Sequence, residues 1–441
     1  MPAENERITR SVVVTLGCVG AGLAIHLLHL RYGLSQLAVD RAATRDWLGG
    51  DGLYAYRTVG ARVGTALPPP AAILFSPAAL LPLVGVGWLL ALAGLTALLL
   101  SVVALAGPVA RRYGKPRGPA VLAAVALALL LEPVRATLGL GCLDLLVFGL
   151  ITADVVALRR ATWARSRAAW WPGPPASRPQ RGRSRSDPVR RTWATGAWAG
   201  VGTGTAIALA VSPIIFLVYL VVTRQWRPAA TAAGTAAFMF AGSWLVAPAA
   251  SAAWFSSVLT QFDRGGPLDA PANQSLAGVL ARLYDSATTP VLIWLAFAGL
   301  LAAVGLIRAR SAHADGDEIA AVTLVGLTGA AFGPVSRVNE LVWVLPAVLI
   351  LIDGAARHRV AVRRPRARRY PGAGHAAAAV LVYLLFVVDP VWTLGWNGYA
   401  FALILLINTL PWRPGVAPAV PSRRRPPVAR RIPAIPGPRG S

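Results

Sequence analysis

Carboxylates that can accept a proton during a reaction gather in one polar segment of the chain, residues 31–83, which follows a long apolar run. Asp40, Asp46 and Asp51 lie in this segment, and a fourth candidate, Glu340, lies between two later apolar runs. A carboxylate placed beside a hydroxyl group can take its proton as a general base. We therefore predict that the catalytic residues are among these four.

A second set of polar residues has the chemistry to hold a substrate. An arginine presents a planar fork of donors to an anion, and amide and hydroxyl side chains both donate and accept hydrogen bonds. The set predicted to bind substrate is Gln36, Tyr54, Asn273, Gln274, Ser275, Arg282 and Asn339. The two cysteines have no metal-ligand spacing, so we expect no metal and no cofactor.

Each candidate also has a structural interpretation that the sequence leaves open. Asp40 and Asp46 each have an arginine beside them and can be solvated loop charges. Ser275 can be the N-cap of a helix that begins after it. Glu340 would be costly in lipid and can pair with Arg337 at the membrane surface. Acidic residues within or beside apolar runs are expected to be satisfied by helix partners, and these are Glu132, Asp144 and Asp154.

The elements that must position these residues are membrane helices. Hydrophobic residues make up 56% of the 441-residue chain and charged residues only 14%, whereas a soluble domain has roughly a quarter of its residues charged. Apolar runs of about 20 residues are long enough to span a bilayer as helices. We predict an all-α polytopic bundle of about twelve membrane segments over residues 1–411, with Pro213 breaking the run 194–223 into a hairpin.

The distribution of basic residues sets the predicted orientation. A net charge of +25 could indicate nucleic-acid binding, but the position of the charge fits a membrane protein better. With both termini inside, 34 of the 43 basic residues fall on the cytoplasmic side, as the positive-inside rule requires. We predict a multi-pass protein of the plasma membrane with cytoplasmic termini, in contact with membrane lipids and not with nucleic acid.

Three loops are then external and two segments are cytoplasmic and basic. The external loops are 31–83, 249–287 and 334–341. Residues 159–192 and 412–441 are rich in Arg and Pro, and we expect both to be disordered beside anionic headgroups. Polar residues concentrated in external loops favour an enzyme with a site at the membrane surface, because a channel places them within its spans.

The order of motifs resembles the polyprenol-phosphate-mannose-dependent mannosyltransferases of actinobacteria, which are integral-membrane glycosyltransferases of the GT-C class. The resemblance covers residues 10–410. Tyr54 followed by the stretch 67–77 is similar to the family's YPPxAALLFxP, and 273–278 with Arg282 is similar to its NQSLxG…R. Residues 334–346 resemble its PxSWDHHxVWLLP.

Several polar positions differ from the family pattern. The family's first-loop Asp, taken as the general base, corresponds to Gln36, and its His pair corresponds to Asn339-Glu340. This chain has Arg337-Val338 in place of the family's Trp-Asp, and Ala210 in place of the lysine before the hairpin proline. The stretch 141–145 stands in place of the family's GQxNL. Asp40 lies four residues beyond Gln36, one turn along the same helix face, so Asp40 is our first candidate for the base.

The resemblance implies an inverting transfer of mannose from a polyprenyl phosphate to a glycan or glycolipid of the cell envelope. Arg282 would then bind the donor phosphate, with Asn273 and Gln274 on sugar hydroxyl groups. The main alternative is a catalytically degenerate relative that acts as a membrane partner or a lipid-sugar binding subunit, because several polar positions have changed. A transporter of lipid-linked sugar is the third hypothesis, although few polar residues lie within the spans.

Overall fold

The computed structural model describes residues 2–58, 63–170, 188–284, 291–361 and 372–413. The described residues form helices and connecting loops with no β-strand, which confirms the predicted all-α class. The first helices in chain order are α1 (Pro2–Tyr32), α2 (Ser35–Leu48), α3 (Pro69–Ala79), α4 (Leu83–Arg112), α5 (Arg117–Leu130), α6 (Glu132–Leu140), α7 (Asp144–Trp170), α8 (Pro188–Thr195), α9 (Val201–Ala210) and α10 (Ile214–Val222).

The second half of the chain continues in the same way. Its helices are α11 (Trp226–Val246), α12 (Pro248–Ser256), α13 (Leu276–Leu283), α14 (Val291–Ala314), α15 (Glu318–Phe332), α16 (Val344–Ala361), α17 (Ala373–Leu385), α18 (Pro390–Gly395) and α19 (Gly398–Thr409). Three short 3₁₀ helices, η1 (Val258–Thr260), η2 (Phe262–Gly265) and η3 (Val338–Trp343), lie in the polar loops or at the start of α16.

Fewer helices than the sequence predicted are long and apolar enough to cross a membrane alone, among the residues that the structure describes. Among the described residues, four stretches are long and apolar enough to cross a membrane, and they are Leu83–Arg112, Trp226–Val246, Val291–Ala314 and Val338–Arg359. The pair α5 and α6, bent by 69°, can form a fifth. The prediction of twelve segments is therefore not confirmed, because several apolar runs fold as shorter helices such as α9, α15 and α19.

The predicted break at Pro213 is confirmed. Helix α9 ends at Ala210 and α10 begins at Ile214, so the apolar run is divided at Ser212-Pro213. Proline lacks the backbone N–H and interrupts the helical hydrogen bonds, which explains the position of the break. The chain thereby turns back next to the core without one long span.

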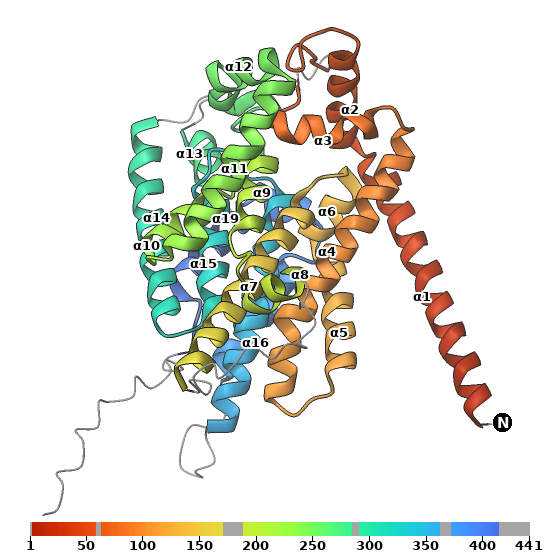
Figure 1. Cartoon of the computed structure of the whole chain (residues 1–441), viewed down its shortest axis with the longest axis vertical. Coiled ribbons are helices and arrows are strands. Elements are labelled where there is room, and N and C mark those ends of the chain that lie inside the picture. The colour runs from red at the N-terminus through yellow and green to blue at the C-terminus, as the bar shows by residue number, and fades with distance from the viewer. Residues whose placement is uncertain (1, 59–62, 171–187, 285–290, 362–371, 414–441) are drawn as a thin grey trace, which may run out of the picture.

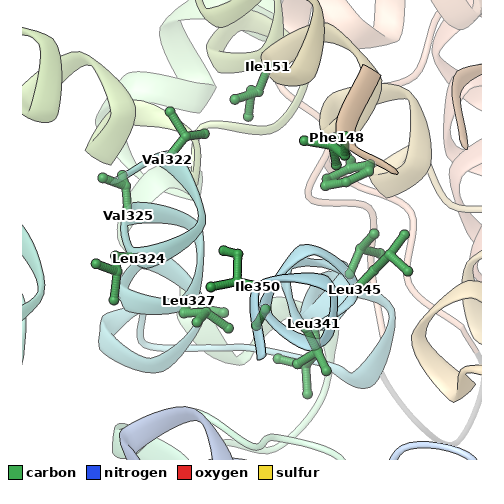
Figure 2. Close-up of a cluster of buried hydrophobic side chains, with 14 of the residues drawn as sticks. Phe148, Ile151, Val322, Leu324, Val325, Leu327, Leu341, Leu345 and Ile350 are labelled. Carbon is green, nitrogen blue, oxygen red and sulfur yellow. The ribbon is translucent and has the colours of Figure 1, made fainter. Parts of the chain in front are cut away.

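Helix α15 forms the centre of the bundle and is buried along almost its whole length. Figure 2 shows its side chains Val322, Leu324, Val325 and Leu327 among those of α7 and α16. The ring of Trp343 packs on the backbone at Gly326, where a Cβ atom would meet the ring at 2.1 Å. Any side chain at Gly326 would therefore displace this tryptophan from the core.

The ring of Trp343 is partly buried and packs against the core. Its ring centroid is 5.0 Å from those of both Phe148 and Phe216. Aromatic pairs at this distance are stabilising beyond the area they bury.

The polar loops collect at one end of the bundle. Helices α2, α3, α12 and α13 lie together at the top of the view in Figure 1, above the long helices. Leu37 of α2 packs with Phe75 of α3 and Val86 of α4, and Leu53 packs with Ala72 and Ala250. These apolar contacts fix the position of α2, which carries the first candidate base.

The two segments predicted to be disordered lie only partly within the described residues. Helix α7 continues to Trp170 and α8 begins at Pro188, so the ends of 159–192 are helical. Hydrogen bonds from Arg160 to the Trp193 carbonyl oxygen at 3.2 Å join these ends. Residues 171–187, half of the first segment, and 414–441, nearly all of the second, lie outside the described residues.

Candidate active site

Helix α2 places Asp40 in a buried polar environment. The side chain of Asp40 is only 9% exposed. Its carboxylate accepts a hydrogen bond from Thr65 Oγ1 at 2.7 Å and from Gln36 Nε2 at 3.1–3.2 Å. The pairing with Gln36 confirms that the two residues share one helix face, as their spacing of four predicted. Asp40 is therefore no solvated loop charge.

Arg337 connects α2 to two other polar loops. Its guanidinium donates to Gln36 Oε1 at 3.1 Å and to the carbonyl oxygen of Gly265. Arg337 also lies close enough to Asp40 for its charge to act on that carboxylate. The three external segments of the sequence analysis thus meet at one guanidinium group.

Two further carboxyl groups belong to the same cluster. Asp144, at the start of α7, accepts a hydrogen bond from Asn339 Nδ2 at 2.7 Å. Asp144 and Glu340 line one small cavity of about 50 Å³ beside Pro213. The positive charge of Arg337 acts on both of them. The charge of this one guanidinium therefore acts on three carboxyl groups, and the group of Asp40, Asp144, Arg337 and Glu340 is called the acidic cluster below.

Burial tunes the basicity of Asp40. Removal of the carboxyl group from water raises the pKa of Asp40 from 3.8 to about 6, and the hydrogen bonds from Thr65 and Gln36 and the charge of Arg337 limit the rise. A carboxylate with a pKa near 6 is ionised at neutral pH and is still a better proton acceptor than an exposed one. This is the range in which a general base works well.

The segment Asn273–Ser275 is a scaffold that joins two polar loops. Asn273 Nδ2 donates to the Pro334 carbonyl oxygen at 3.2 Å, and Asn273 Oδ1 accepts from Ser336 N at 3.0 Å. Ser275 Oγ accepts from Gly278 N at 3.2 Å, which confirms its interpretation as the N-cap of α13. All three side chains of the segment are buried.

The side-chain amide of Gln274 is likewise bonded to the backbone of neighbouring segments. Its Nε2 donates to the Pro271 carbonyl oxygen at 2.8 Å, and its Oε1 accepts from Ala400 N at 3.3 Å. An amide that is fully buried with donors and acceptor engaged positions the backbone around it. Sugar binding by Asn273 and Gln274 stays a prediction, with the geometry favouring a structural role.

The guanidinium group of Arg282 is hydrogen-bonded to other parts of the protein. Its guanidinium donates to the carbonyl oxygens of Ala270 at 2.7 Å and Asn273 at 2.9 Å, and to Asn397 Oδ1 at 3.0 Å. A phosphate would have to displace these acceptors to gain the fork of donors that an arginine offers. The geometry therefore argues against the predicted contact between Arg282 and the donor phosphate. It indicates instead that Arg282 holds the 268–275 loop in place.

Tyr54 lies at the edge of this arrangement. Its hydroxyl donates to the Leu67 carbonyl oxygen at 2.9 Å, and the guanidinium of Arg264 lies 5.3 Å from its ring centroid. Arg264 in turn donates to the Thr65 carbonyl oxygen at 2.7 Å. Tyr54 therefore supports the loop that presents Thr65 to Asp40.

Two of the four predicted catalytic residues are not brought into the acidic cluster. Asp46 is half-buried near the end of α2, and Asp51 is exposed in the turn after it. The backbone N–H of Asp51 donates to the carbonyl oxygen of Asp46 at 3.1 Å, as expected for a turn that closes a helix. Their side chains have no hydrogen bond to any other residue that the structure describes.

The sequence analysis missed the parts played by Thr65, Arg337 and Asp144. Thr65 has no motif around it, and its 25-residue distance from Asp40 along the chain gave no signal. Asp144 was interpreted as an acid satisfied by a helix partner, and its bond to Asn339 confirms that. Arg337 was matched only with Glu340, three residues away, whereas its hydrogen bonds go to Gln36 and Gly265.

A helical membrane bundle that holds a buried carboxylate near a guanidinium has the groups that an integral-membrane enzyme for a group-transfer reaction needs. The carboxylate can take a proton from a hydroxyl group, and the guanidinium can stabilise a negative charge. The sequence matches Glycosyltransferase family 87 over residues 67–335, which is more than half of the chain. The chain belongs to this family of glycosyltransferases.

Several mycobacterial enzymes are similar to this chain over most of its length. The polyprenol-phosphate-mannose-dependent α-(1-2)-phosphatidylinositol mannoside mannosyltransferase of Mycobacterium tuberculosis is 27% identical, over 82% of this chain and 81% of the relative. The corresponding pentamannoside mannosyltransferase of Mycolicibacterium smegmatis is 25% identical, over 82% and 79%. Among solved structures, ArnT from Cupriavidus metallidurans bound to undecaprenyl phosphate overlaps 90% of this chain and 76% of its own, with 16% identity and a TM-score of 0.37.

Proposed function

We propose that this chain transfers mannose from a polyprenyl-phosphate donor to a glycan or glycolipid of the cell envelope, as a membrane glycosyltransferase of the GT-C class. The family assignment and the names of the mycobacterial relatives support the donor and the kind of acceptor. The observation that carries the proposal is the acidic cluster, in which a buried Asp40 with a pKa of about 6 lies beside Arg337.

The proposed reaction is a single displacement with inversion at the anomeric carbon. The acceptor oxygen forms a bond to that carbon while the bond from the carbon to the phosphate oxygen breaks. Asp40 takes the proton of the acceptor hydroxyl group, and the phosphate leaves with the electron pair of the broken bond. Arg337 donates hydrogen bonds to the phosphate as its charge grows.

The neighbours of Asp40 orient it for this task. Thr65 and Gln36 each donate to the carboxylate, which leaves lone pairs free for the acceptor proton. Gln36 also links Asp40 to Arg337. Glu340 is the reserve base, because it lies in the same cluster, while Asp46 and Asp51 need a rearrangement of the loop to reach it.

A catalytically degenerate relative is the second candidate. The observation in its favour is that the NQS segment and Arg282, which resemble the family's motif most closely, are occupied by contacts within the protein. Such a protein would keep the fold and bind the lipid-linked sugar without transferring it. It would act as a membrane partner or as a lipid-sugar binding subunit.

An assay of the purified protein distinguishes the two candidates. With radiolabelled polyprenyl-phosphate-mannose and a panel of phosphatidylinositol mannosides and glycans as acceptors, we expect label in the acceptor and none without it. Donor binding with no turnover on any acceptor would instead favour the degenerate relative. Failure to bind the donor at all would remove both proposals.

We also propose that the acidic cluster faces the outside of the plasma membrane. Reporter fusions at residues 175 and 435 are expected to give cytoplasmic signals, and fusions at 55 and 268 external signals, because 34 of 43 basic residues then lie inside. Alkaline phosphatase and green fluorescent protein fusions, active on opposite sides, measure this directly. An external signal at 175 would reverse the orientation.

A further inference from the structure

A second polar cavity lies at the end of the bundle opposite α2, α3 and α12 (Figure 1). It has a volume of about 170 Å³ and is enclosed by the C-terminal end of α4, by α7, by the α14–α15 turn and by α16. Its polar lining combines arginines with carboxylates, and its apolar lining comes from α4 and α16. Nothing in the transfer reaction uses this cavity.

The carboxylate of Asp353 is neutralised within the protein. Arg413 donates to it from Nε at 2.9 Å and from Nη2 at 2.6 Å, and Arg357 Nε lies 3.2 Å away. Tyr113 donates to the same carboxylate at 3.1 Å. A carboxylate with this many donors has little capacity left to bind a cation.

The other carboxylates of the cavity are also satisfied. Their partners are Trp412 Nε1 on Asp315 at 2.7 Å, Arg413 N and Ala320 N on Asp317 at 3.0 and 3.2 Å, and Tyr219 OH and His313 Nδ1 on Glu318 at 2.8 and 2.6 Å. A ligand of this cavity therefore finds acceptors that are already bonded. The unused hydrogen-bonding capacity must be sought among the donors.

Two arginines of the cavity have that capacity. The guanidinium of Arg159 makes no hydrogen bond and no ion pair with any part of the chain that the structure describes. Arg112 has only one contact of this kind, at 3.7 Å from Asp353, and its side chain is 41% exposed. Both side chains line the same cavity, so the two guanidinium groups face a common region. The charges of Asp317 and Glu318 also act on Arg159 without bonding to it, so its donors are free for an anion such as a phosphate.

The size and the lining of the cavity limit which anions can bind there. A cavity of about 170 Å³ is smaller than the roughly 300–1,000 Å³ of pockets that enclose drug-sized ligands, so a nucleotide does not fit inside it. Leu105, Val109, Leu349 and Ile350 supply an apolar wall next to the arginines. Basic pockets between membrane helices are suited to phospholipid headgroups, whose acyl chains continue along such a wall.

We propose that Arg159 and Arg112 form a binding site for a phosphate ester, with the headgroup of an anionic phospholipid as its source. The phosphate oxygens accept hydrogen bonds from both guanidinium groups. The acyl chains follow the apolar surface of α4 and α16. The site is separate from the acidic cluster and does not depend on the proposed transfer reaction.

Native mass spectrometry of the full-length protein in detergent tests this site with phosphatidylglycerol as the probe and phosphatidylcholine as the neutral comparison. We expect preferential retention of phosphatidylglycerol, reduced at least about tenfold by Arg159→Gln or Arg112→Gln, the scale of one lost charge-assisted hydrogen bond. Arg111→Gln is the matched control, because this substitution removes the same charge from the same helix end, where the charge also acts on Arg159, while Arg111 does not line the cavity.

A second variant distinguishes loss of the binding site from misfolding of the protein. Val109→Trp fills the cavity without altering any charge, and we expect it to lower lipid retention as well. Inorganic phosphate that protects the site from the lipid supports the phosphate site with a soluble ion as its source. Equal retention by Arg159→Gln, Arg112→Gln and Arg111→Gln overturns the proposal, as does equal retention of the two lipids by the unaltered protein.

Discussion

Replacing Asp40 with Asn is expected to lower the rate of mannose transfer by about 10²–10⁴-fold, the usual effect of removing a general base. The amide has nearly the size of the carboxylate, and its oxygen can still accept from Thr65 Oγ1, which lies 2.7 Å from Asp40. The loss is therefore chemical and leaves the packing of α2 unchanged. Initial rates with saturating polyprenyl-phosphate-mannose measure the effect.

Asp46→Asn is the matched control, because Asp46 lies on the same helix and outside the acidic cluster. We expect its rate to stay within about twofold of the unaltered protein, as for a surface substitution away from the site. A rate that survives Asp40→Asn and falls with Glu340→Gln would transfer the role of base to Glu340. A rate that survives both substitutions would remove carboxylates of the cluster from the reaction.

The pH dependence of transfer gives an independent measure of the same residue. Burial raises the pKa of Asp40 to about 6, so the transfer rate should fall as the pH drops through that value and the base becomes protonated. The same change in pH affects the stability of the fold in the direction opposite to its effect on the transfer rate. Because the pKa of Asp40 is higher in the fold than its ordinary value of 3.8, protonation of Asp40 stabilises the fold. This contribution is fully present below pH 3.8 and is lost as the pH rises through about 6. Asp40→Asn should therefore not lower the Tm at neutral pH.

The sequence predicted those parts of the site that depend on local spacing. The interval of four residues between Gln36 and Asp40 placed them on one helix face, and the structure confirms their hydrogen bond. Ser275 was recognised as a possible N-cap from its position before an apolar run, and it caps α13. Pro213 fixed the break between α9 and α10. Each of these features is determined within about one helical turn.

The remaining contacts depend on how distant helices pack, and spacing along the chain does not encode that. Arg337 and Gln36 are 301 residues apart, and Arg282 and Asn397 are 115 apart. Motif similarity assigned Arg282 a ligand role because the sequence does not show whether the donors of an arginine are free for a phosphate or already bonded to carbonyl oxygens. Only the three-dimensional arrangement shows that its donors are already used.

Removing Arg337 is the second change expected to have a large effect. Arg337→Gln takes away the positive charge among Asp40, Asp144 and Glu340, together with the proposed donor to the leaving phosphate. The loss of one preorganised donor to a developing negative charge costs about 10²–10³-fold in rate. We expect a loss of this size in transfer, with a smaller loss for Arg337→Lys, which keeps the charge without the planar fork.

A change in the pH profile separates this role from a merely structural one. The charge of Arg337 lowers the pKa of Asp40, so the pH at which transfer reaches half its maximum should move upward in Arg337→Gln and stay near its original value in Arg337→Lys. Arg41→Gln is the control, because Arg41 follows Asp40 in α2 and donates to the Leu81 carbonyl oxygen at 2.8 Å. If Arg337→Gln keeps the original midpoint while its rate falls no more than that of Arg41→Gln, Arg337 contributes neither to the ionisation of Asp40 nor to the departure of the phosphate.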